Sequence, residues 1–384
     1  ARRRPSLAEF PRRALLRQLD TLIDTTVKEQ RKMSATPNFD NSELLTRAEI
    51  LRRIPQNAIA FATLANDAYA ALAINWALLL LPILCSINAE GHAFIAALDE
   101  PLAETLLKRN LPTLKLAIND STTDATDAPT ANFRLRFSRF RAYGVVKADL
   151  IVWLLTNHRI AVISDVDCAW LKPPHDLLSS LAEADVLAGT DCLHVQEDAD
   201  RSTRNKVVAR CGHHPGSHWS AWFNTGVLFF RVTPNAIAIA SEWRERMAST
   251  SGVPGENNCE HGCKFAVDDQ LTFNQLVAGT PPKPGHHEPI YPVKDARPDG
   301  KVIYDGTGKR KIAALPATSI CSGHVFHVQQ GVKPMDCVVM HLTFVEAGVD
   351  GKYWRLREAG LYPYSPEMPP PVEEPIPQHD TNQP

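Results

Sequence analysis

The sequence predicts an α/β fold, in which a mainly parallel β-sheet is covered by helices on both faces. Short apolar runs of strand length alternate with segments of helical periodicity from residue 58 onward, and this alternation is typical of a parallel sheet between two layers of helices. Polar side chains follow directly after several of the apolar runs. The 384 residues are 44% hydrophobic and 22% charged, which is ordinary for a soluble globular protein.

The first part of the chain supplies a lead-in and two strand–helix units. Residues 1–55 are charged and partly helical by pattern, and we expect a helical stem. A single domain is predicted over residues 56–365, beginning with the apolar strand at 58–65. The units that follow are a helix at 69–84, a strand at 93–98 and a helix at 102–109.

The second part continues the same alternation. A helix at 137–156 leads into a strand at 160–163, and a further helix is expected at 179–186, with a strand from Leu187. The Pro- and Glu-rich tail, 366–384, predicts disorder. The remaining elements are a strand at 224–232, a helix at 234–249, a helix that begins near Asp268-Asp269-Gln270, short strands within 280–320 and a last apolar run at 338–340.

Composition excludes several classes of protein. A formal net charge of −2 argues against nucleic acid as a partner, because such binding depends on phosphate neutralisation. The longest apolar run, Trp76–Cys85, is too short to cross a bilayer and predicts a buried helix. Eight cysteines, six of them in loops or at strand edges and none in a CxxC pair, favour an oxidising compartment.

The segment Arg159–Trp170, RIAVISDVDCAW, organises the predicted site. Asp165 and Asp167 come where its apolar strand ends, and in open α/β sheets ligands bind beyond the carboxyl ends of the strands. Carboxylates at i and i+2 of an extended backbone share one face, so both can bind one hard cation. Such a cation keeps its other positions for phosphate oxygens and water. The motif predicts a metal-dependent enzyme acting on a phosphate-bearing substrate; solvated acids at a strand end are the alternative.

Polar residues recur at the predicted strand ends. Asn66, Asp99 and His341 each follow an apolar run, as the two acids do. Because parallel strands end at one edge of a sheet, this recurrence favours a functional site at that edge.

Four blocks of sequence, in order, resemble a known family. They are VISDVDCAWLKPP (162–174), WFNTGVLFFRV (222–232), VDDQLTFNQLV (267–277) and HLTFVEAGVDGKYWRLREAGLY (341–362), and they resemble the nucleotide-diphospho-sugar transferases of glycosyltransferase family 77, the plant and algal arabinosyl- and xylosyltransferases. The resemblance implies a GT-A fold with a mixed, mainly parallel sheet and retention of anomeric configuration. It also implies a Golgi-luminal, single-pass type II membrane protein whose anchor lies outside this sequence.

The resemblance implies a metal site and a donor site. Asp165, Asp167 and His341 match the metal ligands, an O,O,N set suited to Mn²⁺, with Mg²⁺ as the alternative. The donor implied is a UDP-sugar carrying arabinofuranose or xylose, and the acceptor a hydroxyl of a glycoprotein or polysaccharide. The residues implied to bind the donor are Thr63, Ala65 and Asn66 near uridine, Lys147 and Lys352 near the diphosphate, Asp165 near ribose and Asn224 near the sugar.

The catalytic residues implied are Asp269 and Gln270, placed on the face of the donor sugar. Metal and lysine charge would stabilise the departing diphosphate, and a carboxylate or amide could stabilise an oxocarbenium-like sugar. Whether a covalent intermediate forms stays open, since same-face attack needs no enzyme nucleophile. We expect Asp167→Ala to abolish turnover with the fold intact, as for a solvent-facing acid.

Simpler interpretations stay open for individual residues. Asn224 could cap a turn, Lys147 could extend along its helix to solvent, and His341 could be a hydrogen-bonded core histidine. Trp170 and Trp354 are expected to pack in the interior. The region between 190 and 220 matches no known pattern.

Two other functions are compatible with a strand that ends in DxD. A haloacid-dehalogenase-type phosphatase uses the first Asp as nucleophile, but it normally has Thr or Val where this chain has Ala169, and its DxD follows the first strand. A sugar-binding pseudoenzyme would be expected to lack a metal ligand, whereas Asp165, Asp167 and His341 are all present.

Overall fold

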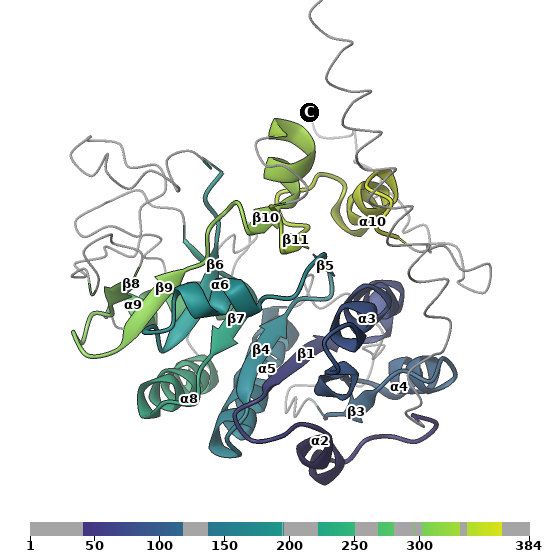
Figure 1. The fold of residues 1–384 in the computed structure, drawn as a ribbon, viewed down its shortest axis with the longest axis horizontal. Helices are drawn as coiled ribbons and strands as arrows, with labels where there is room; N and C mark the ends of the chain where they lie inside the picture. The colour runs from purple at the N-terminus through teal and green to yellow at the C-terminus, as the bar shows by residue number, and fades with distance from the viewer. Residues whose placement is uncertain are drawn as a thin grey trace, which may run out of the picture.

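The computed structural model describes residues 41–117, 137–193, 195, 222–249, 268–279, 296, 302–330 and 336–362 (Figure 1). The predicted stem residues before 41 and the tail at 366–384 lie outside them. In chain order the elements are α2 (Arg47–Arg53), β1 (Ile59–Ala65), η1 (Asp67–Tyr69), α3 (Ala70–Cys85), η2 (Glu90–His92), β2 (Ala93–Ala97), α4 (Glu100–Leu107), β3 (Thr113–Lys115), α5 (Phe137–Thr156), β4 (Ile160–Ser164), β5 (Cys168–Trp170), α6 (His175–Ser180), β6 (Val186–Thr190), β7 (Phe223–Phe230), α8 (Pro234–Ser249), α9 (Asp269–Val277), β8 (Val302–Tyr304), β9 (Lys311–Ala314), β10 (Ile320–Ser322), the π-helix η5 (His324–Gln329), β11 (Val339–His341) and α10 (Gly348–Glu358).

The main sheet has the strand order β3-β2-β1-β4-β7-β6-β9-β8. The strands β3, β2, β1 and β4 run parallel to one another. The strand β7 is antiparallel to both β4 and β6, and β6 and β9 are again parallel. The sheet is therefore mixed, with a wholly parallel half that contains β1 and β4.

Alternate residues of the central strands enter two different cores. In β1, Phe61 packs with residues of α3 and α4 on one face of the sheet, whereas Ala60 and Ala62 pack with residues of α5, α8 and α9 on the other. In β4, Val162 and Ile163 divide between the two cores in the same way. This alternation is the period-2 geometry of a strand buried on both sides. The predicted fold class, a mixed, mainly parallel sheet with helices on both faces, is confirmed.

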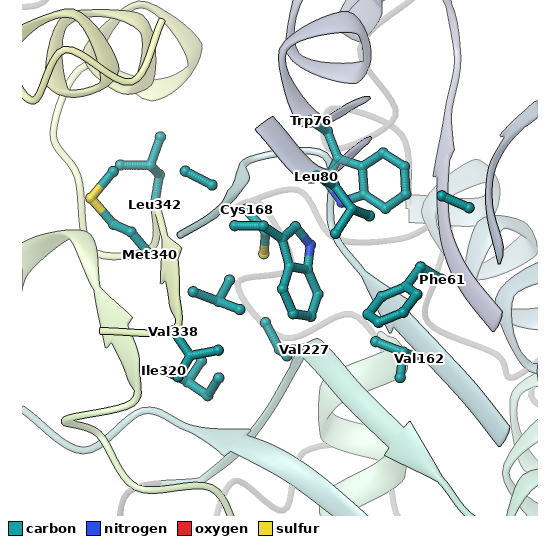
Figure 2. Close-up of a cluster of buried hydrophobic side chains, with 14 of the residues drawn as sticks. Phe61, Trp76, Leu80, Val162, Cys168, Val227, Ile320, Val338, Met340 and Leu342 are labelled. Atoms are coloured by element: carbon teal, nitrogen blue, oxygen red, sulfur yellow. The ribbon is translucent and has the colours of Figure 1, made fainter. Parts of the chain in front are cut away.

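A second, three-stranded sheet of order β10-β11-β5 lies beside the end of β4 (Figure 1). Trp170 of β5 joins it to the main sheet through edge-to-face contacts with Phe61 and Phe229, with ring centroids 5.5 and 6.4 Å apart. Such pairs contribute about 0.5–1.5 kcal/mol each beyond the area they bury. Figure 2 shows Met340 and Leu342 on one side of this cluster and Phe61 and Val162 on the other, with Cys168 between them. Trp170 is an interior residue, as predicted.

Helix caps fix where several helices begin. Thr46 and Glu49 form a reciprocal capping box at α2. Asp99 accepts the Leu102 amide at the start of α4, and Asp268 accepts the Leu271 amide at the start of α9. The strand-end residue Asp99 is thus a helix cap.

Two boundaries differ from the sequence prediction. The helix expected at 179–186 is instead α6, which ends at Ser180, and Val186 already belongs to β6. The second difference concerns the lead-in, since Ile50 and Ile54 are 1% exposed in the core and Arg159 donates to the carbonyl oxygens of Leu51 and Ile54. The packed structure therefore includes residues 41–55 as well as those after 56.

Among the described residues, the stretch Asp67–Cys85 alone has the length and apolar composition of a membrane-spanning helix. Within it, Leu72, Leu80 and Leu84 are fully buried in the core beneath β1 and β2. The helix α3 is therefore a core helix in this fold, as its short apolar run predicts.

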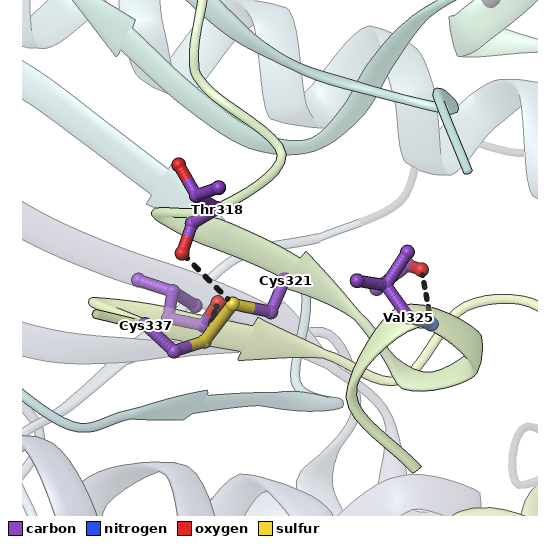
Figure 3. The surroundings of a disulfide bond; sticks show 6 residues. Thr318, Cys321, Val325 and Cys337 are labelled. Carbon is purple, nitrogen blue, oxygen red and sulfur yellow. Dashed lines mark hydrogen bonds between the residues drawn. A yellow bond between two sulfur atoms is a disulfide. The ribbon is translucent and has the colours of Figure 1, made fainter. Parts of the chain in front are cut away.

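A disulfide joins Cys321 of β10 to Cys337, two residues before β11 (Figure 3). The Cα atoms are 5.9 Å apart, within the normal range for a disulfide. Cys192 is also disulfide-bonded, whereas Cys85 and Cys168 are free thiols. The disulfide ties together the two strands that lead to His341.

Candidate functional site

The two acids of the DxD motif lie at the carboxyl end of β4, beside the end of β1. The parallel pairing of Ala62 with Ile163 brings both strands to one edge of the sheet. The Asp165 amide donates to the Gly226 carbonyl oxygen at 2.8 Å, and the Cys168 amide donates to the Asp165 carbonyl oxygen at 3.1 Å. This turn leads from β4 into β5 and fixes both acids at the edge.

His341 reaches the acids through the small sheet. In the antiparallel pair β5–β11 it lies directly opposite Cys168, and the Leu342 amide donates to the Asp167 carbonyl oxygen at 3.1 Å. The His341 Nε2 atom is 3.4 Å from Asp167 Oδ1 and 3.9 Å from Asp165 Oδ2. The structure therefore brings together all three predicted metal ligands.

Gly226 provides the space that the imidazole occupies. A Cβ atom built on this residue would lie 2.1 Å from Cε1 and 2.6 Å from Nε2 of His341. Any side chain at this position would displace the ring. The donor set of two carboxylates and one imidazole, in which the imidazole lies within 4 Å of each acid, suits a divalent cation such as Mn²⁺.

Lys352 of α10 forms an ion pair with the Oδ2 atom of Asp167. The side chains of Lys352 and Asp167 are only 9% and 4% exposed, whereas Asp165 is 25% exposed. The expectation that Asp167 faces solvent is therefore wrong. Asp167 is held between an ammonium group and an imidazole because the small sheet and α10 fold over it.

Lys147 is the centre of the other half of the site. Its Nζ atom lies 3.1 Å from Asp165 Oδ1, 3.1 Å from Asp269 Oδ2 and 2.8 Å from the Thr225 carbonyl oxygen. These acceptors satisfy all three of its donors. Burial lowers the pKa of Lys147, but the two carboxylates outweigh it and raise that pKa above its usual range. The interpretation that Lys147 extends to solvent is wrong, because its side chain is 1% exposed.

Close packing of α5 and α9 brings Lys147 and Asp269 together. A Cβ atom on Gly144 would lie 3.0 Å from Asp269 Cβ and 2.8 Å from Met247 Sδ, so the glycine allows the helices to approach. The Trp243 indole N–H donates to the Asp269 carbonyl oxygen at 2.9 Å. The position of Asp269 is fixed from both sides.

Both oxygens of the Asp269 carboxylate accept hydrogen bonds within the protein. Oδ2 accepts from Lys147 and from the Thr225 hydroxyl, each at 3.1 Å. Oδ1 accepts from the backbone N–H of Gln270 at 3.0 Å. The predicted catalytic acid is thus a fully hydrogen-bonded carboxylate.

Asn224 and Gln270 meet at Asp191, a residue that the sequence analysis missed. The Asn224 Nδ2 atom donates to Asp191 Oδ1, and the Gln270 Nε2 atom donates to Asp191 Oδ2, each at 2.7 Å. Burial raises the pKa of Asp191 despite these hydrogen bonds. Asp191 follows β6 directly, so the strand-end signal was present, but the sequence analysis gave no end to the strand that it predicted from Leu187. The Asn224 Oδ1 atom also accepts from the backbone N–H of Gly226 at 2.8 Å, but Asn224 lies within β7 and not in a turn before the strand.

The residues predicted to meet uridine lie at the end of β1. Thr63, Ala65 and Asn66 are 0%, 3% and 0% exposed. The Thr63 Oγ1 atom is buried without a hydrogen-bond partner, which is uncommon for a buried hydroxyl. Their contact with a nucleotide stays a prediction.

One further residue, Trp354, differs from expectation, and another, Cys168, joins the site without having been predicted. Trp354 of α10 is 73% exposed, so its predicted interior packing is wrong. Cys168 contributes to a cluster with Asp167 and His341 in which one ligand atom from each lies within 4.8 Å of the others. Burial, with the charges of Asp167 and Asp165, raises the pKa of the Cys168 thiol.

Comparison with known proteins adds a family assignment. The family model described as nucleotide-diphospho-sugar transferase matches residues 89–356. The chain is 26% identical over 329 residues to arabinosyltransferase XEG113 of Arabidopsis thaliana, an alignment that covers 84% of this chain and 43% of that protein. The chain thus spans less than half the length of this relative.

Solved structures give more distant likenesses. A galactosyltransferase, LgtC, with donor and acceptor sugar analogues is 12% identical, with a TM-score of 0.42 over 80% of this chain and 98% of that chain. The apo form of mouse xyloside xylosyltransferase 1 is 11% identical, with a TM-score of 0.35 over 75% of this chain and 98% of that chain. Because both TM-scores are below 0.5, the fold is defined by the strand order of the sheet and not by these likenesses.

Proposed function

Because this chain belongs to the nucleotide-diphospho-sugar transferase family, we propose that it transfers a pentose, arabinofuranose or xylose, from a UDP-sugar to a hydroxyl of a glycoprotein or cell-wall glycan. The observation that supports this most is that the His341 Nε2 atom lies within 4 Å of a carboxylate oxygen of both Asp165 and Asp167, with Lys352 paired to Asp167. Such a cluster suits a diphosphate leaving group. The arabinosyltransferase likeness favours a pentose.

Asp165, Asp167 and His341 would hold the metal, with Mn²⁺ proposed and Mg²⁺ as the alternative. The bound cation supplies positive charge to the departing diphosphate. Lys352 has a single ion-pair partner, Asp167, among the described residues. An ammonium group has three donors, so Lys352 can also donate to phosphate oxygens and stabilise the charge that forms as the glycosidic bond breaks.

The carboxylates beside the proposed sugar position do not resemble free nucleophiles. Asp269 is saturated with hydrogen bonds from Lys147, Thr225 and Gln270, and both oxygens of Asp191 accept amide hydrogens. These contacts support same-face transfer with retention, in which the leaving phosphate takes the acceptor proton. Asp269 then positions Lys147, and Gln270 orients the sugar together with Asn224.

The disulfide Cys321–Cys337 supports an oxidising compartment. We propose the Golgi lumen, with attachment to the membrane through an anchor outside this sequence.

A panel of UDP-sugars tests the function. The purified protein should release UDP from UDP-arabinofuranose or UDP-xylose only when Mn²⁺ is present, and more quickly when a glycan acceptor is added. A phosphatase would cleave simple phosphomonoesters instead, and a pseudoenzyme would bind UDP-sugar without releasing UDP. Metal-independent release, or release from none of the donors, would contradict the proposal.

A further inference from the structure

We propose that Cys168 is an additional metal ligand, which gives the site a second, softer donor set that binds Zn²⁺. The inference rests on the proposed metal site and concerns which cations that site accepts. The proposed Zn²⁺ ligands are the thiol of Cys168, the imidazole of His341 and the carboxylate of Asp167. Their ligand atoms lie within 4.8 Å of one another.

Strand pairing aims the thiol at the imidazole. Cys168 and His341 are directly opposite in the antiparallel pair β5–β11, and opposite residues present their side chains on the same face with Cβ atoms about 4.5–5.5 Å apart. The Cys168 thiol donates to the Gly226 carbonyl oxygen at 3.4 Å, and Gly226 is the residue against which the His341 ring lies. Two independent contacts therefore direct both side chains to one place.

The spacing agrees with a tetrahedral site after a small adjustment. Zn–S and Zn–N bonds of about 2.3 and 2.0–2.1 Å place neighbouring ligand atoms about 3.5 Å apart. The His341 Nε2 and Asp167 Oδ1 atoms are already 3.4 Å apart. The cluster has an upper limit of 4.8 Å between ligand atoms, so the sulfur has to approach by at most about 1.3 Å, which a change in the Cys168 side-chain torsion can supply.

The two donor sets share Asp167 and His341 and differ in one ligand each. The harder set takes Asp165, whose side chain is 25% exposed, and suits Mn²⁺. The softer set takes Cys168, which is 2% exposed. Thiolate and imidazole ligands select Zn²⁺, which also binds N/O/S sites more tightly than Mn²⁺ in general. Binding of Zn²⁺ releases the thiol proton to solvent.

The alternative is that Cys168 only fills space. Figure 2 shows it in the apolar cluster beside Met340 and Leu342, and buried cysteines often behave as small apolar residues. In that case the metal affinities would not depend on the sulfur atom.

Calorimetric titrations with Zn²⁺ and Mn²⁺ separate the two interpretations. Cys168→Ser should weaken Zn²⁺ binding by about 10–100-fold or more and leave Mn²⁺ affinity unchanged, while Asp165→Asn should do the reverse. Cys85→Ser, at the other free thiol, should change neither affinity. An unchanged Zn²⁺ affinity in Cys168→Ser would overturn the proposal.

Cobalt spectroscopy tests thiolate ligation in the wild-type protein, so that the conclusion does not depend on the Zn²⁺ affinity of Cys168→Ser alone. Co²⁺ added to the wild-type protein should produce a near-ultraviolet thiolate-to-cobalt charge-transfer band, and the band should be lost in Cys168→Ser and in Cys168→Ala. A wild-type Co²⁺ complex without that band, or a band that survives both substitutions, would refute thiolate ligation. Failure of the proposed function is distinguishable, because it would appear as no Mn²⁺-dependent UDP binding whatever the cobalt spectrum shows.

Discussion

Two buried lysines contact the two acids of the DxD motif from opposite sides, and they differ in how many of their donors are used. Lys147 has three partners, Asp165, Asp269 and the Thr225 carbonyl oxygen. Lys352 pairs with Asp167, its one ion-pair partner among the described residues. A saturated ammonium can only position its neighbours, whereas an unsaturated one can also bind an anion. From this difference we propose a structural role for Lys147 and a ligand-binding role for Lys352.

The largest effect is expected from Lys147→Met. Removing the ammonium leaves Asp269 buried and Asp165 half-buried without their cation, which should cost about 3–5 kcal/mol of unfolding free energy. Urea denaturation measures the loss. Lys352→Met is the matched control and should cost less, because Asp167 keeps the His341 imidazole beside it. A Lys147→Met protein as stable as the wild type, but unable to bind UDP, would reverse the two roles.

Gly226→Ala should disrupt only the half of the site in which His341 and Lys352 contact Asp167. The new Cβ would lie 2.1 Å from the His341 ring, so the imidazole must move, and Mn²⁺ affinity should fall by about 10–100-fold. Gly189→Ala is the control, since its Cβ would make contacts of 3.4 Å or more. Unchanged Mn²⁺ affinity in Gly226→Ala would remove His341 from the ligand set.

Lys352→Met should weaken UDP binding directly. A hydrogen bond to a charged group contributes about 1.5–3 kcal/mol, so the UDP dissociation constant should rise by about 10–100-fold. Isothermal titration in the presence of Mn²⁺ measures it. Lys108→Met, at the residue that follows α4 and whose side chain is 77% exposed, should have no effect. Equal UDP affinities in wild type and Lys352→Met would show that the lysine does not reach phosphate.

The smallest effect is a loss of stability at acid pH. It depends on His327, which lies beside Glu358 of α10, the helix that carries Lys352. Burial lowers the pKa of His327 to about 4, with the Glu358 carboxylate 3.5 Å away opposing the shift. The unfolded chain therefore binds more protons between about pH 6.5 and 4. Stability should fall as pH drops through this window, by about 1–3 kcal/mol, and His327→Gln should flatten that part of the pH–stability curve. An unchanged curve would show that His327 does not contribute.

The sequence predicted the features that depend on local pattern. The alternation of apolar runs gave β1, β2, β4, β7 and their helices within a residue or two, because strand and helix periods are local. The DxD acids and His341 were found because Asp165 follows β4 directly, Asp167 comes two residues later, and His341 ends the apolar run of β11. Asp191 follows a strand as well, but it was missed because the strand predicted from Leu187 was given no end.

The features that depend on long-range packing could not be read from the sequence. The burial of Asp167 results from the folding of β11 and α10 over the DxD turn. The pairing of Cys168 with His341 depends on the register of β5 and β11, and the saturation of Lys147 depends on α9 and β7. In the same way, no local pattern indicates that Trp354 points to solvent while its neighbours Lys352 and Tyr353 are buried.

The central claim is that two strand-end acids and the His341 imidazole hold a cation against a nucleotide diphosphate. Pulsed electron paramagnetic resonance of the Mn²⁺-loaded protein with UDP tests it most directly. The account predicts nitrogen coupling that is absent in His341→Ala, together with phosphorus coupling from the bound diphosphate. Tightly bound Mn²⁺ without coupling to nitrogen or phosphorus would contradict it.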